Sequence, residues 1–165
     1  AMTDGKAYEG LFHYDDVEPG SETKQVAEGT ENLVYQAAEG EKWVDINLTD
    51  ASVTAYIGGK VAGGPFYMVP GAPDTPTVTG TFHVYLKYDV HTMRGENADG
   101  SKYVTEGVPW VTYFTGSYAM HGAPWRSSFG WSGYGGSHGC VNMPVDAAKF
   151  IYDWTDMGDT VVVHY

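Results

Sequence analysis

The chain has 165 residues, a length that a single hydrophobic core can serve, so one main domain is expected. Its formal net charge of −12 opposes the phosphate backbone of nucleic acids, so no nucleic-acid partner is expected. The apolar residues form no run near the roughly 18 that a membrane-spanning helix needs, so no membrane span is expected in this chain. The single cysteine, Cys140, excludes an internal disulfide and leaves its thiol inert, metal-bound, paired with another chain or reactive.

The first forty residues differ in composition from the rest of the chain. Residues 1–40 are acidic, above all in the stretch from Asp15 to Glu31, and they are poor in long apolar patterns. We interpret them as an acidic arm, a linker or the edge of an upstream module, with the strand-like residues 33–36 able to pack on the main domain. The first five residues show no basic start and apolar middle, so no export signal or anchor is recognised. The main domain is expected over residues 41–165.

From Trp43 onward the pattern is that of a mainly β protein. Short runs rich in Val, Thr, Tyr and Phe are separated by Gly, Pro, Asp and Asn. These runs are KWVDINL, SVTAYIGGKV, PFYMV, TFHVYLKY and WVTYFTG. The pair Gly58-Gly59 predicts a tight hairpin, because glycine accepts the positive φ that such turns require, so the flanking strands should be antiparallel.

The end of the chain predicts one helix and one buried strand. Pro144 stands near a first helical position, Asp146 falls in the first turn and Gly158 lies just beyond, which favours a short helix over residues 145–154. The run TVVVHY at residues 160–165 has three consecutive valines, which is typical of a central strand buried on both faces. The expected fold is therefore a β-sandwich or barrel-like domain with one short helix after Cys140.

The candidate catalytic residues lie between Tyr118 and Asn142. A thiol becomes a nucleophile when a nearby base favours its deprotonation, and two histidines, His121 and His138, are available. Gly139 precedes Cys140 and would let the backbone approach a substrate, where amide groups can donate to a developing oxyanion. This pattern indicates acyl transfer by a cysteine nucleophile.

Other interpretations stay open on residue type alone. A lone cysteine is often a buried small hydrophobe, and each histidine can be structural. His121, His138 and Cys140 could also be three ligands of a zinc ion, although no acidic residue lies between residues 121 and 140 to act as a base. We expect no metal.

The motif itself resembles that of the L,D-transpeptidases of the YkuD family. That family has a histidine-glycine pair, a loop of about fifteen residues, and then Ser/Thr-His-Gly-Cys-apolar-Asn. Here the pair is HG at 121–122 and the second part is SHGCVN at 137–142. The stretch TPTVTGTF at 75–82 is similar to the family's strand entry, and MRG at 93–95 to its lid. The resemblance covers Trp43 to His164 and implies the YkuD-type fold.

The resemblance also implies roles for individual residues. Cys140 would be the nucleophile, His121 the general base, the Gly122 carbonyl the group that orients the imidazole, and the amides of Gly139 and Cys140 part of the oxyanion hole. Further residues would shape the site and bind substrate. They are Ser137, His138, Asn142, Tyr113, Trp125, Trp131 and Met93. Packing is the default role of the aromatic residues, and exposure on the catalytic loop would instead make them walls of the substrate groove.

The reaction implied by the family is peptidoglycan cross-linking without a cofactor. Cys140 would attack the carbonyl of the third residue of a tetrapeptide stem, release D-alanine, and pass the acyl group to the side-chain amine of another stem's third residue, a 3→3 cross-link. Carbapenem-type β-lactams would acylate the same thiol, and the place of action would be the bacterial cell envelope. L,D-carboxypeptidase activity, attachment of a wall protein, and a wall-binding module without catalysis are the alternatives.

Overall fold

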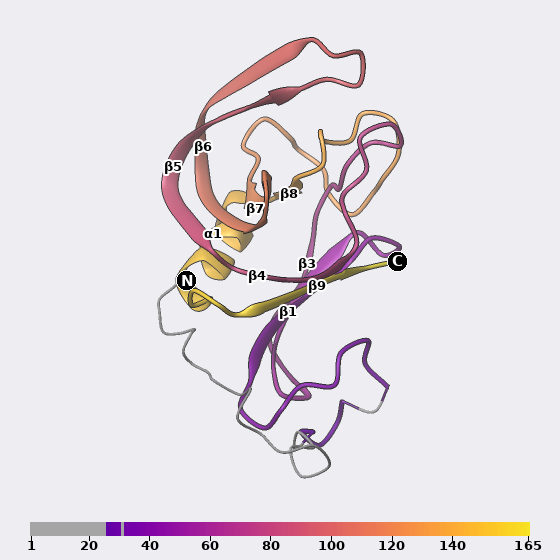
Figure 1. Cartoon of the computed structure of the whole chain (residues 1–165), viewed down its shortest axis with the longest axis vertical. Coiled ribbons are helices and arrows are strands. Elements are labelled where there is room, and N and C mark those ends of the chain that lie inside the picture. The colour runs from indigo at the N-terminus through magenta and orange to yellow at the C-terminus, as the bar shows by residue number, and fades with distance from the viewer. Residues whose placement is uncertain (1–25, 31) are drawn as a thin grey trace.

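The protein is built from two β-sheets and one helix, as the computed structural model shows for residues 26–30 and 32–165 (Figure 1). The first sheet contains β1 (Lys42–Asn47), β2 (Ser52–Ile57), β3 (Lys60–Tyr67), β4 (Gly80–His83) and β9 (Thr160–His164). The second contains β5 (Leu86–Glu96), β6 (Lys102–Thr115), β7 (Tyr118–Gly122) and β8 (Val141–Met143). The helix α1 (Val145–Trp154) follows β8 directly. The fold is therefore mainly β, with its helix just after Cys140, which confirms the predicted fold class.

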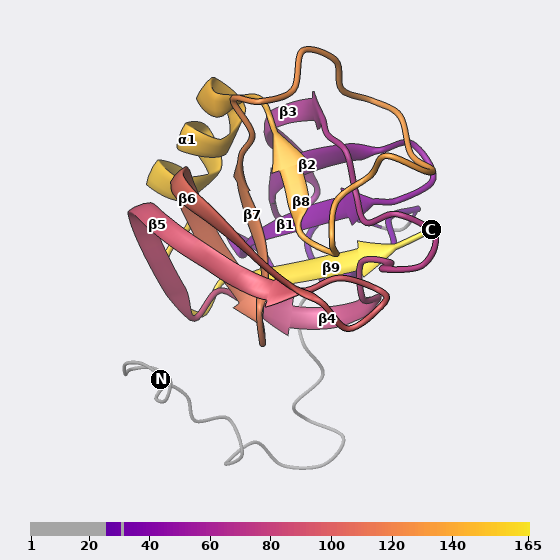
Figure 2. The ribbon, with the colours of Figure 1, turned by 90° about the horizontal axis from the view of Figure 1, so that it is seen from above.

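The strand orders are β3-β2-β1-β9-β4 and β5-β6-β7-β8. Most neighbours are antiparallel, but β1 pairs with β9 and β7 with β8 in parallel. Figure 2 shows the two sheets facing each other, with α1 closing one end of the space between them. The two parallel pairs join strands that are distant in the chain, so the C-terminal third of the sequence contributes to both sheets.

The main core fills the space between the sheets and α1. Alternate residues of β1 and β9 face it, including Val44, Ile46, Val161 and Val163, all nearly inaccessible to solvent. The helix contributes Ile151, which is also fully buried. Burial of this many aliphatic and aromatic side chains is the main stabilising term of such a domain.

The opposite face of the first sheet is also covered. Trp43 and Val162 point away from the main core and pack with Ala37, while Leu33 and Tyr35 lie against them. Trp43 also donates from Nε1 to the Gly58 carbonyl oxygen. The described part of the first forty residues thus covers this face, which explains why β9 carries consecutive valines. Residues 1–25 and 31, which hold most of the acidic stretch from Asp15 to Glu31, lie outside the described residues.

Several predicted elements have the expected bounds. The hairpin at Gly58-Gly59 joins β2 to β3 in antiparallel register, and Gly58 has φ +60°. The helix covers residues 145–154 with Pro144 at its N-cap, and β9 lies inside its sheet between β1 and β4.

The sequence suggested that the run TFHVYLKY forms one strand, but it does not. It divides into β4 and β5, which belong to different sheets. The backbone changes partner at Val84 and Tyr85: Val84 donates to the Asp159 carbonyl oxygen near β9, and Tyr85 donates to that of Tyr113 in β6.

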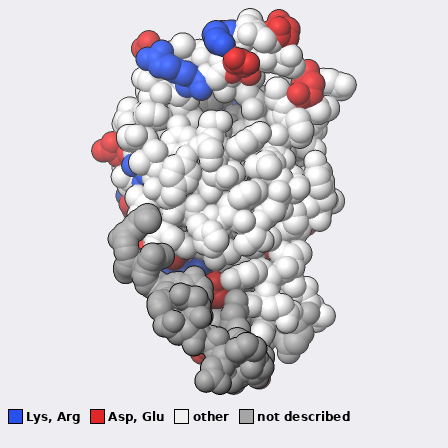
Figure 3. Space-filling view, viewed as in Figure 1, with Lys and Arg blue, Asp and Glu red and all other residues white. Residues whose placement is uncertain are grey.

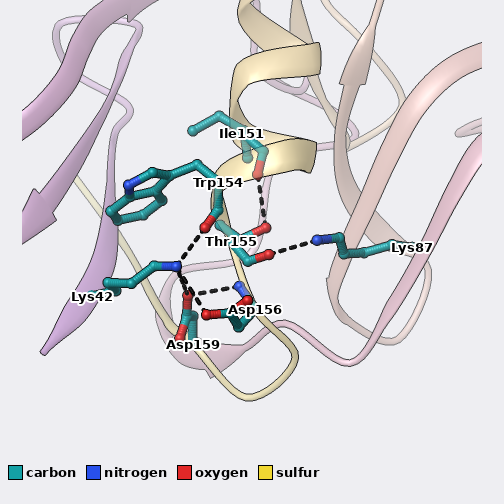
Figure 4. A network of polar contacts seen from close by, with 7 residues as sticks. All are labelled: Lys42, Lys87, Ile151, Trp154, Thr155, Asp156 and Asp159. Carbon is teal, nitrogen blue, oxygen red and sulfur yellow. Dashed lines mark hydrogen bonds and ion pairs between the residues drawn. The ribbon is translucent and has the colours of Figure 1, made fainter.

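Two lysines, one from each sheet, bind the C-terminal end of α1 (Figure 4). Lys42 Nζ lies 2.6 Å from the Trp154 carbonyl oxygen, and Lys87 Nζ lies 2.6 Å from that of Thr155. These carbonyls have no helical partner, and positive charge is favourable at a helix C-terminus. Lys42 also pairs with Asp156 at 2.9 Å, and burial raises the pKa of Asp159 beside it to about 6. The contacts fix α1, and with it the adjoining β8, against both sheets.

The hairpin of β5 and β6 extends beyond the second sheet and forms a lid, residues 91–108 (Figure 1). Figure 3 shows charged side chains gathered at this end of the molecule. The exposed charged residues near the lid tip are Arg94, Glu96, Asp99 and Lys102. Among the described residues no helix is long and apolar enough to cross a membrane.

Candidate active site

The parallel pairing of β7 and β8 brings the histidine and cysteine segments together. His121 in β7 is the register partner of Asn142 in β8. Cys140 lies at the bend that immediately precedes β8, two residues before Asn142. His121, Cys140 and Asn142 all line one pocket.

The imidazole of His121 is buried and has defined partners on both ring nitrogens. Nδ1 lies 2.9 Å from the Gly122 carbonyl oxygen. Since a carbonyl can only accept, Nδ1 carries the hydrogen and Nε2 keeps its lone pair. Nε2 lies 3.3 Å from Asn142 Nδ2. Burial lowers the pKa of His121 to about 4, against a smaller opposing effect of the Gly122 carbonyl, so the ring is neutral at pH 7.

The thiol of Cys140 lies against the backbone around the turn from β6 to β7. Sγ is 3.4 Å from the Ser117 carbonyl oxygen. Residue Cys140 is partly accessible, yet its sulfur is desolvated, because it packs on a cluster that includes Tyr113 and Ala119. Burial raises the pKa of the thiol to about 11, so it too is neutral at pH 7.

The segment before β8 is tied to residues 69–77 by backbone and side-chain bonds. Thr77 Oγ1 donates to the Gly139 carbonyl oxygen at 2.7 Å, and Thr75 Oγ1 donates to that of Ser137 at 2.9 Å. Val69 exchanges two backbone bonds with Asn142. These contacts fix the path of the chain on both sides of Cys140.

Gly139 is required by its conformation and by its neighbour. Its φ is +125°, and a Cβ at this position would lie 2.7 Å from the Tyr118 ring. Its N–H donates to Ser137 Oγ at 3.0 Å, and Ser137 Oγ donates to the Cys140 carbonyl oxygen. The Gly139 amide is therefore engaged within the loop. The sequence suggested that this amide donates to an oxyanion, but in this arrangement it is not available to one.

The lid contacts the same loop through His138. His138 Nε2 lies 2.6 Å from Asn97 Oδ1, and the His138 ring stacks on Tyr103 with centroids 4.0 Å apart. Tyr103 and Met93, both from the lid, line the pocket. His138 thus joins the lid to the loop rather than facing Cys140 as a base.

The aromatic residues and the methionine that were predicted to bind substrate separate into three groups. Trp125 and Met93 line the pocket, and Trp125 is 50% exposed beside the His121 ring. Tyr113 packs with the cluster beneath Cys140, where burial raises its pKa to about 12. Trp131 is not among the residues that line the pocket; its ring lies under the Arg126 guanidinium at 5.5 Å.

The sequence interpretation missed Arg126 and Tyr103. Arg126 lines the pocket and donates from Nε to Asn142 Oδ1 at 2.8 Å. It is the one Lys or Arg between His121 and Cys140 in the sequence, a signal that was available. Tyr103 had no such signal, because its contact with His138 depends on how the lid folds.

The zinc alternative is not supported by the geometry. Within residues 26–30 and 32–165, no group of three His, Cys, Asp or Glu side chains is placed to hold a metal ion. His121, His138 and Cys140 therefore do not form a ligand set.

Comparison with known proteins agrees with this architecture. The family model for the YkuD L,D-transpeptidase catalytic domain matches residues 41–163. L,D-transpeptidase 1 of Mycobacterium tuberculosis is 33% identical over 101 residues, which are 56% of this chain and 39% of the relative. The chain thus spans about two fifths of the length of that curated relative.

Solved structures give the same result. The catalytic domain of the E. faecium L,D-transpeptidase is 28% identical, with a TM-score of 0.69 over 78% of this chain and 100% of that one. An L,D-transpeptidase from Mycobacterium smegmatis is 27% identical, with a TM-score of 0.64 over 76% of this chain and 59% of that one. With a family model that matches most of its length, this chain belongs to the YkuD family of L,D-transpeptidase catalytic domains.

Proposed function

We propose that the protein is a cysteine-dependent peptidoglycan L,D-transpeptidase in which Cys140 is the nucleophile and His121 the general base. The single observation that carries this proposal is the pairing of β7 with β8, which puts both side chains on one pocket with the imidazole in its Nδ1–H form. An unprotonated Nε2 is the form that can accept a thiol proton.

The first half of the reaction forms a thioester. Cys140 Sγ attacks the carbonyl carbon of the third stem residue while its proton passes to His121 Nε2. Since thiol and imidazole are both neutral at rest, proton transfer accompanies attack instead of preceding it. The C–N bond to the terminal D-alanine then breaks, and the imidazolium returns the proton to the leaving amine. Rotation of the thiol from the Ser117 carbonyl toward the imidazole begins this sequence.

The second half transfers the acyl group. The side-chain amine of another stem's third residue attacks the thioester, His121 takes a proton from that amine, and the thiol is restored. Water in place of the amine gives L,D-carboxypeptidase activity from the same intermediate. The backbone amide of Cys140 is the remaining candidate donor for the oxyanion, because that of Gly139 is engaged with Ser137.

A related protein supports the choice of inhibitor. The E. faecium domain has been captured acylated by ertapenem. By the same chemistry, a carbapenem carbonyl would acylate Cys140, and a peptidoglycan substrate implies action in the bacterial cell envelope.

A defined tetrapeptide stem tests this function. The wild-type protein should release D-alanine and give a 3→3 linked dimer, both measured by mass spectrometry. Cys140→Ala should abolish release, and His121→Asn should slow it by about 100-fold or more, because a general base contributes roughly 10²–10⁴. Lys149→Met, on the exposed face of α1, is the matched control and should leave the rate unchanged. D-Alanine release by Cys140→Ala at the wild-type rate would refute the assignment.

A further inference from the structure

We propose that Arg126 is a positioning residue that acts on His121 through Asn142, holding the amide so that its NH2 group faces the imidazole. This inference deepens the proposed function and rests on His121 being the base. No role for Arg126 follows from the histidine and cysteine motif itself. It is an arginine in the loop between the two residues, fixed by contacts on three sides.

The first step is the orientation of the Asn142 side chain. Arg126 Nε donates to Asn142 Oδ1 at 2.8 Å. A guanidinium has only donors, so the atom that it faces must be the amide oxygen. Asn142 Nδ2 then faces His121 Nε2 at 3.3 Å. Arg126 thereby decides which end of the amide the imidazole meets.

The second step is the effect on protonation. An NH2 group facing Nε2 favours the neutral ring, whose lone pair accepts, and opposes an imidazolium, whose N–H would meet another donor. In the absence of Arg126 the amide could turn and offer its oxygen to an imidazolium. The positive charge of Arg126 acts in the same direction, since it contributes to lowering the pKa of His121. Both effects keep His121 neutral, with Nε2 unprotonated; they lower its strength as a base and make its protonated form a stronger acid toward the leaving amine.

The third step is the rigidity of the arginine. Its Nη1 donates to the Gly135 carbonyl oxygen at 3.1 Å, and the guanidinium lies over the Trp131 ring at 5.5 Å. A planar fork bound at two atoms and stacked on a ring is more restricted than a lysine would be. Arg126 therefore also links the two ends of the loop to β8, which bears Asn142.

Other ionisable groups near the imidazole do not replace this contact. The pocket also contains Tyr103 from the lid, His138 and Cys140. His138 is bonded to Asn97, and the thiol and phenol are neutral at pH 7. Among the described residues, Arg126 is the charged side chain whose field acts on His121.

The test measures the pKa of His121 directly by NMR titration of its ring nitrogens in the full chain, which does not depend on activity. Arg126→Met should raise that pKa above the wild-type value of about 4. Asn142→Ala should raise it as well, and adding Arg126→Met to Asn142→Ala should then have a smaller effect than in the wild-type background. Arg126→Lys, which keeps the charge without the fork, should fall between wild type and Arg126→Met.

Kinetics provide the second readout. At pH values below the pKa of His121 in both proteins, each unit by which the pKa rises should lower the rate of D-alanine release roughly tenfold, because the neutral fraction of the base falls by that factor. The loss should therefore grow as the pH decreases. Lys149→Met is the control: it removes an exposed positive charge on α1, away from the pocket, and should not move the pH profile.

The alternative is that Arg126 binds an anionic group of the substrate. A loss confined to tetrapeptides with a free C-terminal carboxylate, and absent for the C-terminal amide, with the pKa of His121 unchanged in Arg126→Met, would overturn the proposal. An unchanged pKa with a uniform loss at all pH values would also overturn it, because that is the result of a loop that is merely disordered. If neither the wild-type protein nor any variant releases D-alanine, and the titration still shows the shift, the proposed function fails and the contact with His121 stands.

Discussion

At the scale of single residues, the site is a pair of neutral groups whose charged forms are disfavoured by burial. Desolvation acts on Cys140 and His121 in opposite directions, raising the pKa of the thiol and lowering that of the imidazole. In the proposed mechanism, such a pair holds no thiolate at rest, and the thiolate character of Cys140 develops only as its proton passes to His121.

The pH dependence of alkylation tests the neutral pair. The thiolate is the reactive form, and a pKa of about 11 in place of 9 lowers its fraction at pH 7 by about 100-fold relative to an ordinary thiol. With iodoacetamide, the rate at Cys140 should rise about tenfold per pH unit from pH 6 to 9 without an inflection. Because the chain has one cysteine, intact mass reports the reaction directly. A plateau with a midpoint near pH 6 or 7 would show a thiolate–imidazolium pair instead.

The sequence identified some of these residues and not others, for physical reasons. Cys140 and His121 are marked by their types and by the glycines beside them. Arg126 acts through a side-chain amide, and Tyr103 reaches His138 across the lid, so neither contact follows from spacing along the chain. The engagement of the Gly139 amide with Ser137 was missed because it depends on the conformation of the loop.

At the scale of elements, the lid forms part of the wall of the pocket that Cys140 lines. The pocket measures only about 150 Å³, below the roughly 300 Å³ at which ligand sites usually begin. We therefore expect a stem peptide, the proposed substrate, to enter with a movement of the lid, and we expect the contact of Asn97 with His138 to oppose that movement.

Loosening this contact should favour large reagents. In Asn97→Ala, modification of Cys140 by a bulky maleimide should become up to about fivefold faster, since a lost hydrogen bond is worth about 1 kcal/mol, while iodoacetamide should react at the wild-type rate. Intact-mass time courses measure both. Glu96→Ala is the control, because its described contact is an exposed ion pair with Lys102 in the same hairpin. Equal acceleration of both reagents, or of neither, would argue against a lid held by His138.

Elements that depend on local patterns were predictable. The glycine hairpin and α1 have the expected bounds because turn chemistry and helix ends are encoded within a few residues. The division of TFHVYLKY into β4 and β5 was not, because it results from distant partners: the Asp159 carbonyl binds Val84, and that of Tyr113 binds Tyr85. The short strands β7 and β8 are recognisable only through their pairing.

At the scale of the whole molecule, two sheets and a helix hold the segment that contains Cys140 from both sides. Residues 69–77 fix one side of Cys140, and β7 fixes the other. The lysines at the end of α1 connect both sheets to the helix that follows β8. The site is thus supported by parts of the chain that are far apart in sequence, and only the family resemblance anticipated that they meet.

The most direct test of the central claim is intact-protein mass after incubation with a carbapenem, followed by peptide mapping. The account predicts one adduct per chain, located on the peptide that contains Cys140, absent in Cys140→Ala and slowed by about 100-fold or more in His121→Asn. Full labelling of Cys140→Ala, or an adduct mapped to another residue, would contradict it.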